Sequence, residues 1–178
     1  MITLFKKLQS EDLLKKQGML LDLGSGDGSV AKAFLEFGYN LTLLDKNPEL
    51  LELAKKNLGD SEIKTVNENI ENFKFENKYD GIIISNVLPF VTNKEKIEEI
   101  VRNAFDNLNK GGFLFFTLFG DKDEWKDQRK DTMSFYTKEE AGRILKEIPY
   151  FQSEDYGKGK TMKGDMKTWH ILYFLYLK

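Results

Sequence analysis

The chain of 178 residues is long enough for one buried core and too short for two ordinary domains, so we expect a single domain over residues 1–178. Apolar residues make up 40% and charged residues 31%, which is typical of a globular protein and argues against a disordered chain. The net charge is −2, so no excess of Lys and Arg marks a nucleic-acid-binding face. We therefore expect no nucleic-acid partner.

Missing residue types exclude several kinds of site. The chain has no cysteine, which excludes disulfides, thiolate metal sites and cysteine nucleophiles. Its one histidine, His170, argues against a His-rich zinc or iron centre, and no metal is expected. The N-terminus lacks the apolar core of a signal peptide, and the runs "FLFFTLF" and "ILYFLYL" are far shorter than a membrane span. We expect a cytoplasmic protein without a membrane partner.

Short apolar runs follow an N-terminal helix that we expect over residues 1–17. Most of the runs are nearly continuous rather than alternating, as in strands that are covered by helices on both faces. They predict strands at Met19–Leu23, Leu41–Leu44, Ile63–Val66, Gly81–Ile84 and Phe113–Phe119.

Segments of helical spacing or with capping signals separate or follow these runs. They predict helices over Val30–Phe37 with Gly38 as the stop, from Asn47 and Pro48 to about Asn57, over Ile97–Leu108 with Gly111 as the end, and from the capping box Thr137–Glu140 to about Lys146. The helix that carries the Ile97 stripe is expected to begin at Thr92 or Asn93. Strands that alternate with helices indicate a parallel sheet with right-handed crossovers.

The last forty residues break this alternation. A short strand near Tyr150–Tyr156 is followed by the polar stretch "GKGKTMKGDMK" and by a final strand, Trp169–Leu177. Two strands without a helix between them indicate an antiparallel hairpin. The predicted fold is a doubly wound, Rossmann-like α/β domain with a mostly parallel seven-stranded sheet, helices on both faces and a C-terminal antiparallel hairpin strand.

A glycine-rich loop, within "LLDLGSGDG", follows the first predicted strand. Gly24 permits a turn that a side chain would forbid, and Gly26 lets a ligand lie against the backbone. Asp45 ends the second strand, where a carboxylate can accept hydrogen bonds from both hydroxyls of a ribose. Ligands of doubly wound folds bind beyond the carboxyl ends of the strands. The pattern predicts a nucleoside site; the alternative is a loop that only packs helix on strand.

The stretch "LLDLGSGDG" resembles motif I of class I S-adenosylmethionine-dependent methyltransferases, in which an acidic residue precedes G-x-G-x-G. A dinucleotide-binding loop would instead read G-x-G-x-x-G or G-x-G-x-x-A, and Ser29 stands at its sixth position. The family also ends in a reversed hairpin strand. The resemblance implies that Asp22 orients the loop and the methionine end of S-adenosylmethionine, that Gly24 and Gly26 lie under this cofactor, and that Asp45 holds its ribose.

The same resemblance implies further cofactor contacts. In "NENIENF", Asn69 matches the position that meets the adenine amino group and Ile70 the apolar residue against the ring, with Glu68 as the competing assignment. The turn after the fourth strand, in "YDGIIISNVLPFV", would face the amino group of the cofactor. The candidate set is completed by Ser25, Lys46, Ser85 and Asn86.

The expected reaction is methyl transfer from S-adenosylmethionine to a small-molecule acceptor by in-line displacement, which leaves S-adenosylhomocysteine. The sulfonium is already a strong donor, so positioning can suffice and no catalytic residue is assigned. The segment Gly120–Tyr136 is too long for a mere connector. Its aromatic residues either close over the acceptor as a lid or pack on the core edge. Candidate acceptor contacts are Phe90, Trp125, Tyr136 and His170, although a lone histidine more often packs.

Other functions stay open. "NVLPF" places two residues between Asn86 and Pro89, unlike the Asn/Asp-Pro-Pro-aromatic turn of methylases that act on RNA or base nitrogens. A non-catalytic nucleoside sensor would share the glycine loop, whereas an NAD-dependent oxidoreductase is disfavoured by Ser29. The arrangement "LFGDKDEW … FYTKEEA … WHILYF" resembles small bacterial methyltransferases of the tellurite-resistance and thiopurine types.

Overall fold

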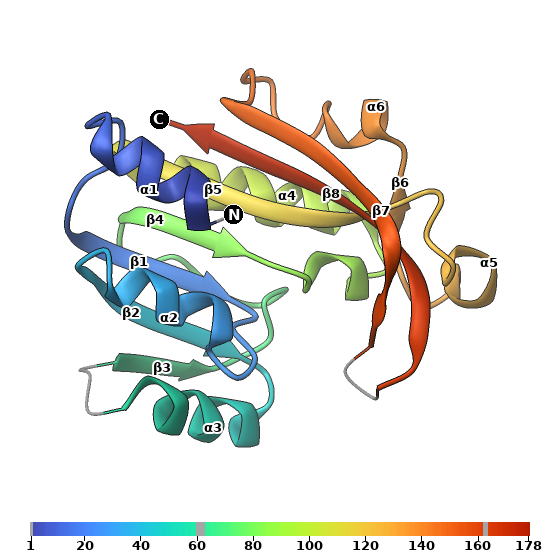
Figure 1. Ribbon diagram of the computed structural model, residues 1–178, viewed down its shortest axis with the longest axis horizontal. Helices are drawn as coiled ribbons and strands as arrows, with labels where there is room; N and C mark the ends of the chain where they lie inside the picture. Colours follow the sequence, from blue (N-terminus) through green and yellow to red (C-terminus); the bar gives the residue numbers. More distant parts are fainter. Residues whose placement is uncertain (1, 60–62, 162–163) are drawn as a thin grey trace.

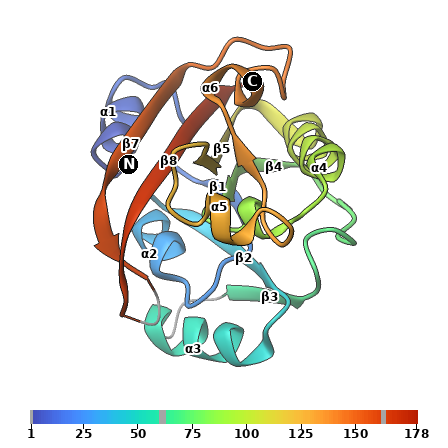
Figure 2. The same ribbon diagram turned by 90° about the vertical axis from the view of Figure 1, so that its right-hand side faces the viewer.

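The computed structural model describes residues 2–59, 63–161 and 164–178. It contains one sheet, with strand order β3-β2-β1-β4-β5-β8-β7 and a short β6 that pairs with the end of β5. The strands are β1 (Gly18–Leu23), β2 (Tyr39–Asp45), β3 (Ile63–Asn67), β4 (Tyr79–Ile84), β5 (Leu108–Gly120), β6 (Phe135–Tyr136), β7 (Phe151–Lys160) and β8 (Met166–Leu177). Helices cover both faces (Figures 1 and 2). The predicted doubly wound, mostly parallel sheet with an antiparallel C-terminal hairpin is confirmed.

Side-chain caps set where the two longest helices begin. Asn47 Oδ1 accepts a hydrogen bond from the Glu49 N–H at 2.9 Å, and Asn93 Oδ1 accepts one from the Lys96 N–H at 2.9 Å. The helices are α1 (Ile2–Ser10), α2 (Ser29–Leu35), α3 (Pro48–Leu58), the 3-10 turn η1 (Leu88–Phe90), α4 (Lys94–Asp106), α5 (Lys126–Arg129) and α6 (Lys138–Ala141).

Two apolar layers hold these helices on the sheet. On the face of α1 and α2, the rings of Phe5 and Phe34 lie 5.0 and 5.9 Å from the ring of Phe113 on β5. On the face of α4, Phe116 stacks on Phe174 and Tyr176 of β8, with ring centroids 5.2 and 6.0 Å apart. Alternate residues of β5 therefore serve the two layers, which accounts for its nearly continuous apolar run.

The strand order reverses between β1 and β4. β1 pairs in parallel with β2 on one side and with β4 on the other, whereas β8 runs antiparallel to β5. The carboxyl ends of β1, β2 and β4 consequently lie at one edge of the sheet (Figure 1). Such a reversal is where open α/β sheets bind ligands. It brings together the loops that follow residues 23, 45 and 84.

The helix predicted from Thr137 to about Lys146 is much shorter than expected. The capping box is present, but α6 ends at Ala141. Gly142 follows directly, and glycine has a low helix propensity. The Ile144 carbonyl accepts a hydrogen bond from Arg102 Nε at 3.3 Å, so it is tied to α4 instead of to a helix of its own.

Other predicted boundaries were also wrong. The N-terminal helix ends at Ser10 instead of near residue 17, and α4 ends at Asp106. Gly111 lies inside β5 and does not end the helix. Its N–H donates to the Lys178 carbonyl at 2.6 Å, next to the end of the neighbouring strand β8. The polar stretch 157–167 largely continues the hairpin, because the β7–β8 ladder extends to the pair of Lys160 and Met166.

The segment 120–136 contains regular structure. It begins at the end of β5, forms the single turn α5 and ends in β6, which pairs in parallel with β5 at Phe119 and Gly120. Among the described residues, no helix is long and apolar enough to cross a membrane.

Candidate functional site

The glycine loop after β1 has a left-handed backbone at three positions. Gly24, Gly26 and Gly28 have φ angles of +74°, +55° and +77°. A Cβ on Gly24 would collide with the Val87 side chain, so this glycine lets the loop pack against the turn after β4. A Cβ on Gly26 would meet no atom within 4 Å. Gly26 therefore borders open space, as expected where a ligand approaches the backbone.

The loop is tied to the end of β2. The N–H groups of Gly24 and Ser25 donate to the Leu44 carbonyl at 2.7 and 2.9 Å. The Gly26 N–H donates to Asp45 Oδ2, and the Asn47 N–H donates to Asp45 Oδ1, each at 2.9 Å. A carboxylate offers about four acceptor positions, so Asp45 retains acceptor capacity after these two bonds. Asp45 both fixes the loop and can bind hydroxyl groups of a ligand.

Asp22, just before the end of β1, is a buried acid with an unused oxygen. Its side chain is 1% exposed, and its Oδ2, like the Ser25 hydroxyl, has no hydrogen-bond partner among the described residues. Burial, and secondarily the negative charge of Asp45, raises the pKa of Asp22 to about 7. An unpaired buried carboxylate is costly, so this position suits a cationic ligand group.

The pKa of Asp22 predicts a specific pH dependence of stability. Unfolded, this carboxyl ionises near its ordinary pKa of 3.8; folded, it holds its proton to about pH 7. Between these values the folded state binds more protons than the unfolded state. The free energy of unfolding therefore falls as pH rises, by up to about 1.4 kcal/mol per pH unit from this group. Urea unfolding at pH 5 and pH 7.5 should show that Asp22→Asn gains stability relative to wild type at the higher pH. An unchanged difference would contradict the raised pKa.

The predicted adenine contacts lie beyond β3. Asn69 is half-buried, and its Oδ1 accepts the Glu71 N–H at 3.1 Å, so that acceptor is used within a local turn. Ile70 is 8% exposed and belongs to the core beside α4. The competing Glu68 accepts the Asn69 N–H at 2.8 Å, and Lys46 is exposed. An adenine contact at Asn69 or Ile70 stays a prediction.

The turn after β4 is fixed by a residue that the sequence analysis missed. Asn86 has a left-handed backbone, with φ +57°. Its N–H donates to Thr117 Oγ1 at 2.8 Å, and that hydroxyl donates to Asn86 Oδ1 at 3.2 Å. Thr117 is 1% exposed on β5. The sequence signal that could have identified Thr117 is its hydroxyl, which interrupts the apolar run "FLFFTLF". Val87, the next residue, packs against Gly24, so Ser85 and Asn86 lie beside the glycine loop.

Aromatic residues of the segment 120–136 pack on the core edge in this structure. Trp125 lies 5.3 Å from Trp169 and 6.3 Å from Phe119, ring centroid to centroid. The Lys167 ammonium lies 3.9 Å from the Trp125 ring centroid and forms a buried ion pair with Asp123. Burial lowers the pKa of Lys167. The sequence analysis missed this pair, which anchors the segment to β8.

Of the predicted acceptor contacts, only one is well exposed. Phe90 on η1 is 52% exposed, with its ring 6.3 Å from that of Phe119. Tyr136 is buried below the Lys94 ammonium, which lies 4.4 Å from its ring centroid. His170 is buried; its Nδ1 accepts the Lys122 N–H at 3.1 Å, and its Nε2 lies 3.4 Å from Glu154 Oε2. Roles of Tyr136 and His170 in acceptor binding stay predictions.

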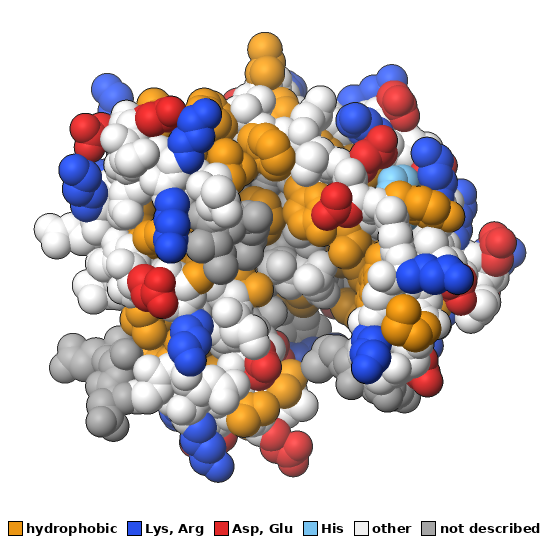
Figure 3. All heavy atoms as spheres, in the orientation of Figure 1, with side chains coloured by type: hydrophobic (Ala, Val, Ile, Leu, Met, Phe, Trp, Pro, Cys, Tyr) orange, Lys and Arg blue, Asp and Glu red, His pale blue; other side chains and the backbone are white. Residues whose placement is uncertain are grey.

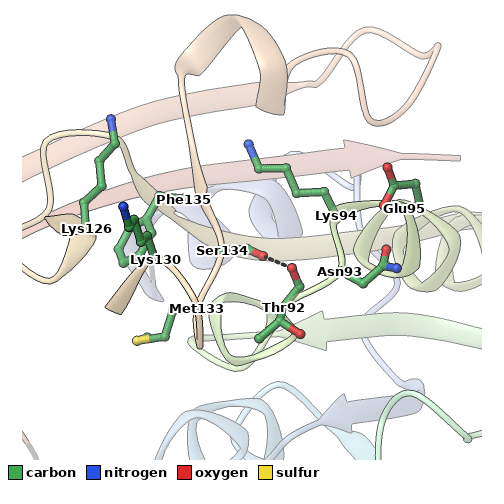
Figure 4. Close-up of a pocket in the computed structure, with 9 residues that line it drawn as sticks. All are labelled: Thr92, Asn93, Lys94, Glu95, Lys126, Lys130, Met133, Ser134 and Phe135. Atoms are coloured by element: carbon green, nitrogen blue, oxygen red, sulfur yellow. Dashed lines mark hydrogen bonds between the residues drawn. The ribbon is translucent and has the colours of Figure 1, made fainter. Parts of the chain in front are cut away.

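Hollows flank the turn after β4 on two sides. The space-filling view is hollowed between the β7–β8 hairpin and the half of the molecule that carries α2 and α3, beyond the ends of β1 and β4 (Figure 3). A separate cavity of about 630 Å³ lies between α5 and the start of α4 (Figure 4). It is lined by Thr92, Asn93, Lys94, Glu95, Lys126, Lys130, Met133, Ser134 and Phe135, and so by none of the candidate cofactor residues.

Comparison with known proteins identifies the family. Residues 21–116, more than half of the chain, match the family described as a methyltransferase domain. The chain belongs to this family. The matched range begins inside β1 and ends inside β5, so it contains every candidate cofactor residue. The methyltransferase match excludes the segment 120–136 and the β7–β8 hairpin, where three of the four candidate acceptor contacts lie.

Curated relatives of this methyltransferase domain are considerably longer. Malonyl-[acyl-carrier protein] O-methyltransferase 1 of Ilyobacter polytropus is 32% identical over 111 residues, which are 61% of this chain and 40% of that protein. Ubiquinone/menaquinone biosynthesis C-methyltransferase UbiE of Zymomonas mobilis is 28% identical over 101 residues, 56% of this chain and 42% of that protein. The chain thus spans about two fifths of the length of these relatives.

Solved methyltransferase structures share the fold over almost the whole chain. TehB from Haemophilus influenzae superposes with a TM-score of 0.78 at 19% identity and covers 98% of this chain and 62% of its own. The N-methyltransferase NodS from Bradyrhizobium japonicum, in complex with S-adenosylhomocysteine, has a TM-score of 0.64 at 18% identity, with 98% of this chain and 88% of that chain covered. At these identities the likeness shows the fold alone, that of the class I S-adenosylmethionine-dependent methyltransferases.

Proposed function

We propose that the domain binds S-adenosylmethionine at the carboxyl edge of β1, β2 and β4 and transfers its methyl group to a small-molecule acceptor. Three observations at this edge carry the proposal together. Asp22 Oδ2 is buried without a hydrogen-bond partner among the described residues, and an added Cβ on Gly26 would meet open space. The Asp45 carboxylate accepts two backbone N–H groups and can accept further hydrogen bonds. These groups lie where the strand order reverses, which is where such folds bind nucleosides.

The residues present fit this cofactor. Asp22 and Ser25 offer oxygens that have no hydrogen-bond partner in the described part of the chain, and they suit the charged amino-acid end of the cofactor. Asp45 suits the ribose hydroxyls, and Gly26 provides room for close approach. When bound, the cofactor supplies a sulfonium methyl group that needs no further activation. The protein then has to hold the acceptor in line with it, and such positioning is worth up to roughly 7–11 kcal/mol.

The acceptor side is built from the turn after β4 and from the segment 120–136. The exposed Phe90 ring near Phe119 offers an apolar surface at the end of the sheet. The relatives' names include an O-methyltransferase and a C-methyltransferase, so they support methyl transfer but favour no one acceptor atom. We therefore assign an acceptor class, small molecules, and no catalytic base.

Asp45→Ala is expected to weaken binding of S-adenosylhomocysteine by roughly 1.5–3 kcal/mol, or about tenfold to 150-fold, because charge-assisted hydrogen bonds to the ligand are lost. Asp45→Asn is the matched control. It keeps one acceptor oxygen and should lose less affinity. Isothermal titration calorimetry measures both variants. Unchanged affinity in Asp45→Ala would remove this residue from the ribose site.

A methyl-transfer experiment tests the reaction itself. The protein is incubated with S-adenosylmethionine and a panel of thiol, amine, hydroxyl and carboxylate acceptors, with RNA as a further arm, and formation of S-adenosylhomocysteine is followed by mass spectrometry. The proposal expects acceptor-dependent turnover with at least one small molecule. Turnover with RNA alone would favour the base-nitrogen methylase, and tight cofactor binding without turnover would favour a nucleoside sensor. Either result would contradict the proposal.

A further inference from the structure

The strand β7 is a long and exposed edge of the sheet. It pairs with β8 on one side only and ends the strand order (Figures 1 and 2). Eight of its ten residues are exposed. The opposite edge, β3, has only five residues, three of them half-buried. An unpaired edge strand presents a row of free N–H and C=O groups on which another strand can pair.

Exposed apolar side chains lie on β7 and on the residues that flank it. Of the nine large hydrophobic residues that are exposed in the described part of the chain, five lie between positions 148 and 166: Ile148, Tyr150, Phe151, Tyr156 and Met166. Of the other four, only Phe90 lies on the turn after β4. A concentration of this kind is typical of an interaction surface.

The charges along β7 are divided between its two halves. Glu154 and Asp155 lie in the first half, and Lys158 and Lys160 lie in the second. Such a strand is complementary to itself only in the antiparallel direction, because a parallel copy would oppose like charges. An antiparallel copy that places Tyr156 opposite its own counterpart also places Glu154 opposite Lys158, and opposite charges across a strand pair stabilise the sheet.

Alternation along the strand puts these groups on one face. Glu154, Tyr156 and Lys158 are two residues apart, so their side chains lie on the same side of the sheet. This is the side of His170, which lies 3.4 Å from Glu154 through its Nε2 and 6.0 Å from the Tyr156 ring, centroid to centroid. The complementary charges and the exposed Tyr156 ring would therefore meet their counterparts directly.

We propose that β7 is a homodimer interface, at which two copies of this chain pair their β7 strands antiparallel about a twofold axis near Tyr156. The same patch then contacts itself, as a twofold interface requires. The two sheets then join into one continuous sheet. A dimer of this kind would form whether or not the chain transfers methyl groups. Pairing of one edge strand is at the small end of protein interfaces, so we expect a dissociation constant on the order of 10 µM.

Charge reversal tests this pairing. Analytical ultracentrifugation of the 178-residue chain over about 1–200 µM, a range set by that expected constant, should show a monomer–dimer equilibrium. The variant Lys158→Glu with Lys160→Glu makes the whole strand acidic and should be monomeric throughout. The variant Glu154→Lys with Asp155→Lys makes it basic and should also be monomeric. An equimolar mixture of the two should recover the dimer.

A matched control separates position from charge. Lys32→Glu with Lys64→Glu changes the net charge by the same amount away from β7, at two exposed lysines, and should dimerise like the wild type. Thermal unfolding verifies that each variant folds. If the basic variant does not fold, dimerisation of the acidic variant is compared with dimerisation of this control, and that comparison tests the proposal. A wild type that is monomeric at 200 µM, or a dimer that survives in the acidic variant, would overturn the proposal.

Discussion

Replacing Gly26 with valine is expected to abolish binding of S-adenosylmethionine while the fold persists. An added Cβ would meet no atom within 4 Å beyond the neighbouring residues, so the valine side chain extends into the space assigned to the ligand. The φ angle of +55° makes any L side chain strained there, at a cost of roughly 1–2 kcal/mol. Calorimetry should show affinity lowered beyond detection.

A second glycine supplies the control for that strain. Gly59, after α3, has φ +72° and ψ −151°, and an added Cβ would likewise meet no atom of the described residues within 4 Å. This backbone conformation is essentially confined to glycine, so Gly59→Val should lose at least as much stability in urea unfolding as Gly26→Val and keep wild-type cofactor affinity. If both variants bind normally, the glycine loop is not the cofactor site; if both lose binding, the effect of Gly26→Val comes from instability.

Asp123→Ala is expected to produce the largest loss of stability, about 3–5 kcal/mol, because it leaves the Lys167 ammonium buried without its counter-charge. It also removes the acceptor of the Trp125 N–H at 3.0 Å and of the His170 N–H at 3.1 Å. Urea unfolding measures the loss. We expect the segment 120–136 to become accessible to proteases before the rest of the chain.

The double variant Asp123→Asn with Lys167→Met tests whether the charge is responsible. It removes both charges and keeps side chains of similar size, so it should lose far less stability than Asp123→Ala. The Met side chain can still contact the Trp125 and Trp169 rings. Equal losses in the two variants would show that packing, and not the ion pair, anchors this segment.

Local signals predicted the cofactor half well. Asn47 was predicted as the cap of α3, and α4 was predicted to begin at Thr92 or Asn93; both starts are confirmed, with Asn93 as the second cap. The glycine spacing with Asp45 predicted groups that lie close together, since the Gly26 N–H donates to Asp45 Oδ2 at 2.9 Å. Their signals are short-range, since a cap or a turn is specified within a few residues. The doubly wound, mostly parallel sheet followed from the alternation of strands and helices.

Features that depend on distant partners could not be predicted in this way. The α6 helix stops early beside a carbonyl held by Arg102 from α4, and Asn86 is fixed by Thr117 from β5. Lys167 and Asp123 are 44 positions apart, and no sequence pattern links the two. Charged residues in a polar stretch usually lie in solvent, so the burial of this pair had no local signal.

A side-by-side comparison of three ligands tests most directly the claim that this edge of the sheet binds S-adenosylmethionine. Thermal unfolding is measured with S-adenosylmethionine, S-adenosylhomocysteine and NAD, each at about a hundred times the expected dissociation constant. Binding at that excess adds roughly 2.7 kcal/mol, which for a chain of this size raises the midpoint by roughly 5–10 °C. We predict this rise with the two S-adenosyl compounds and none with NAD. A rise with NAD alone, or with none of the three, would contradict the assignment of this edge of the sheet to S-adenosylmethionine.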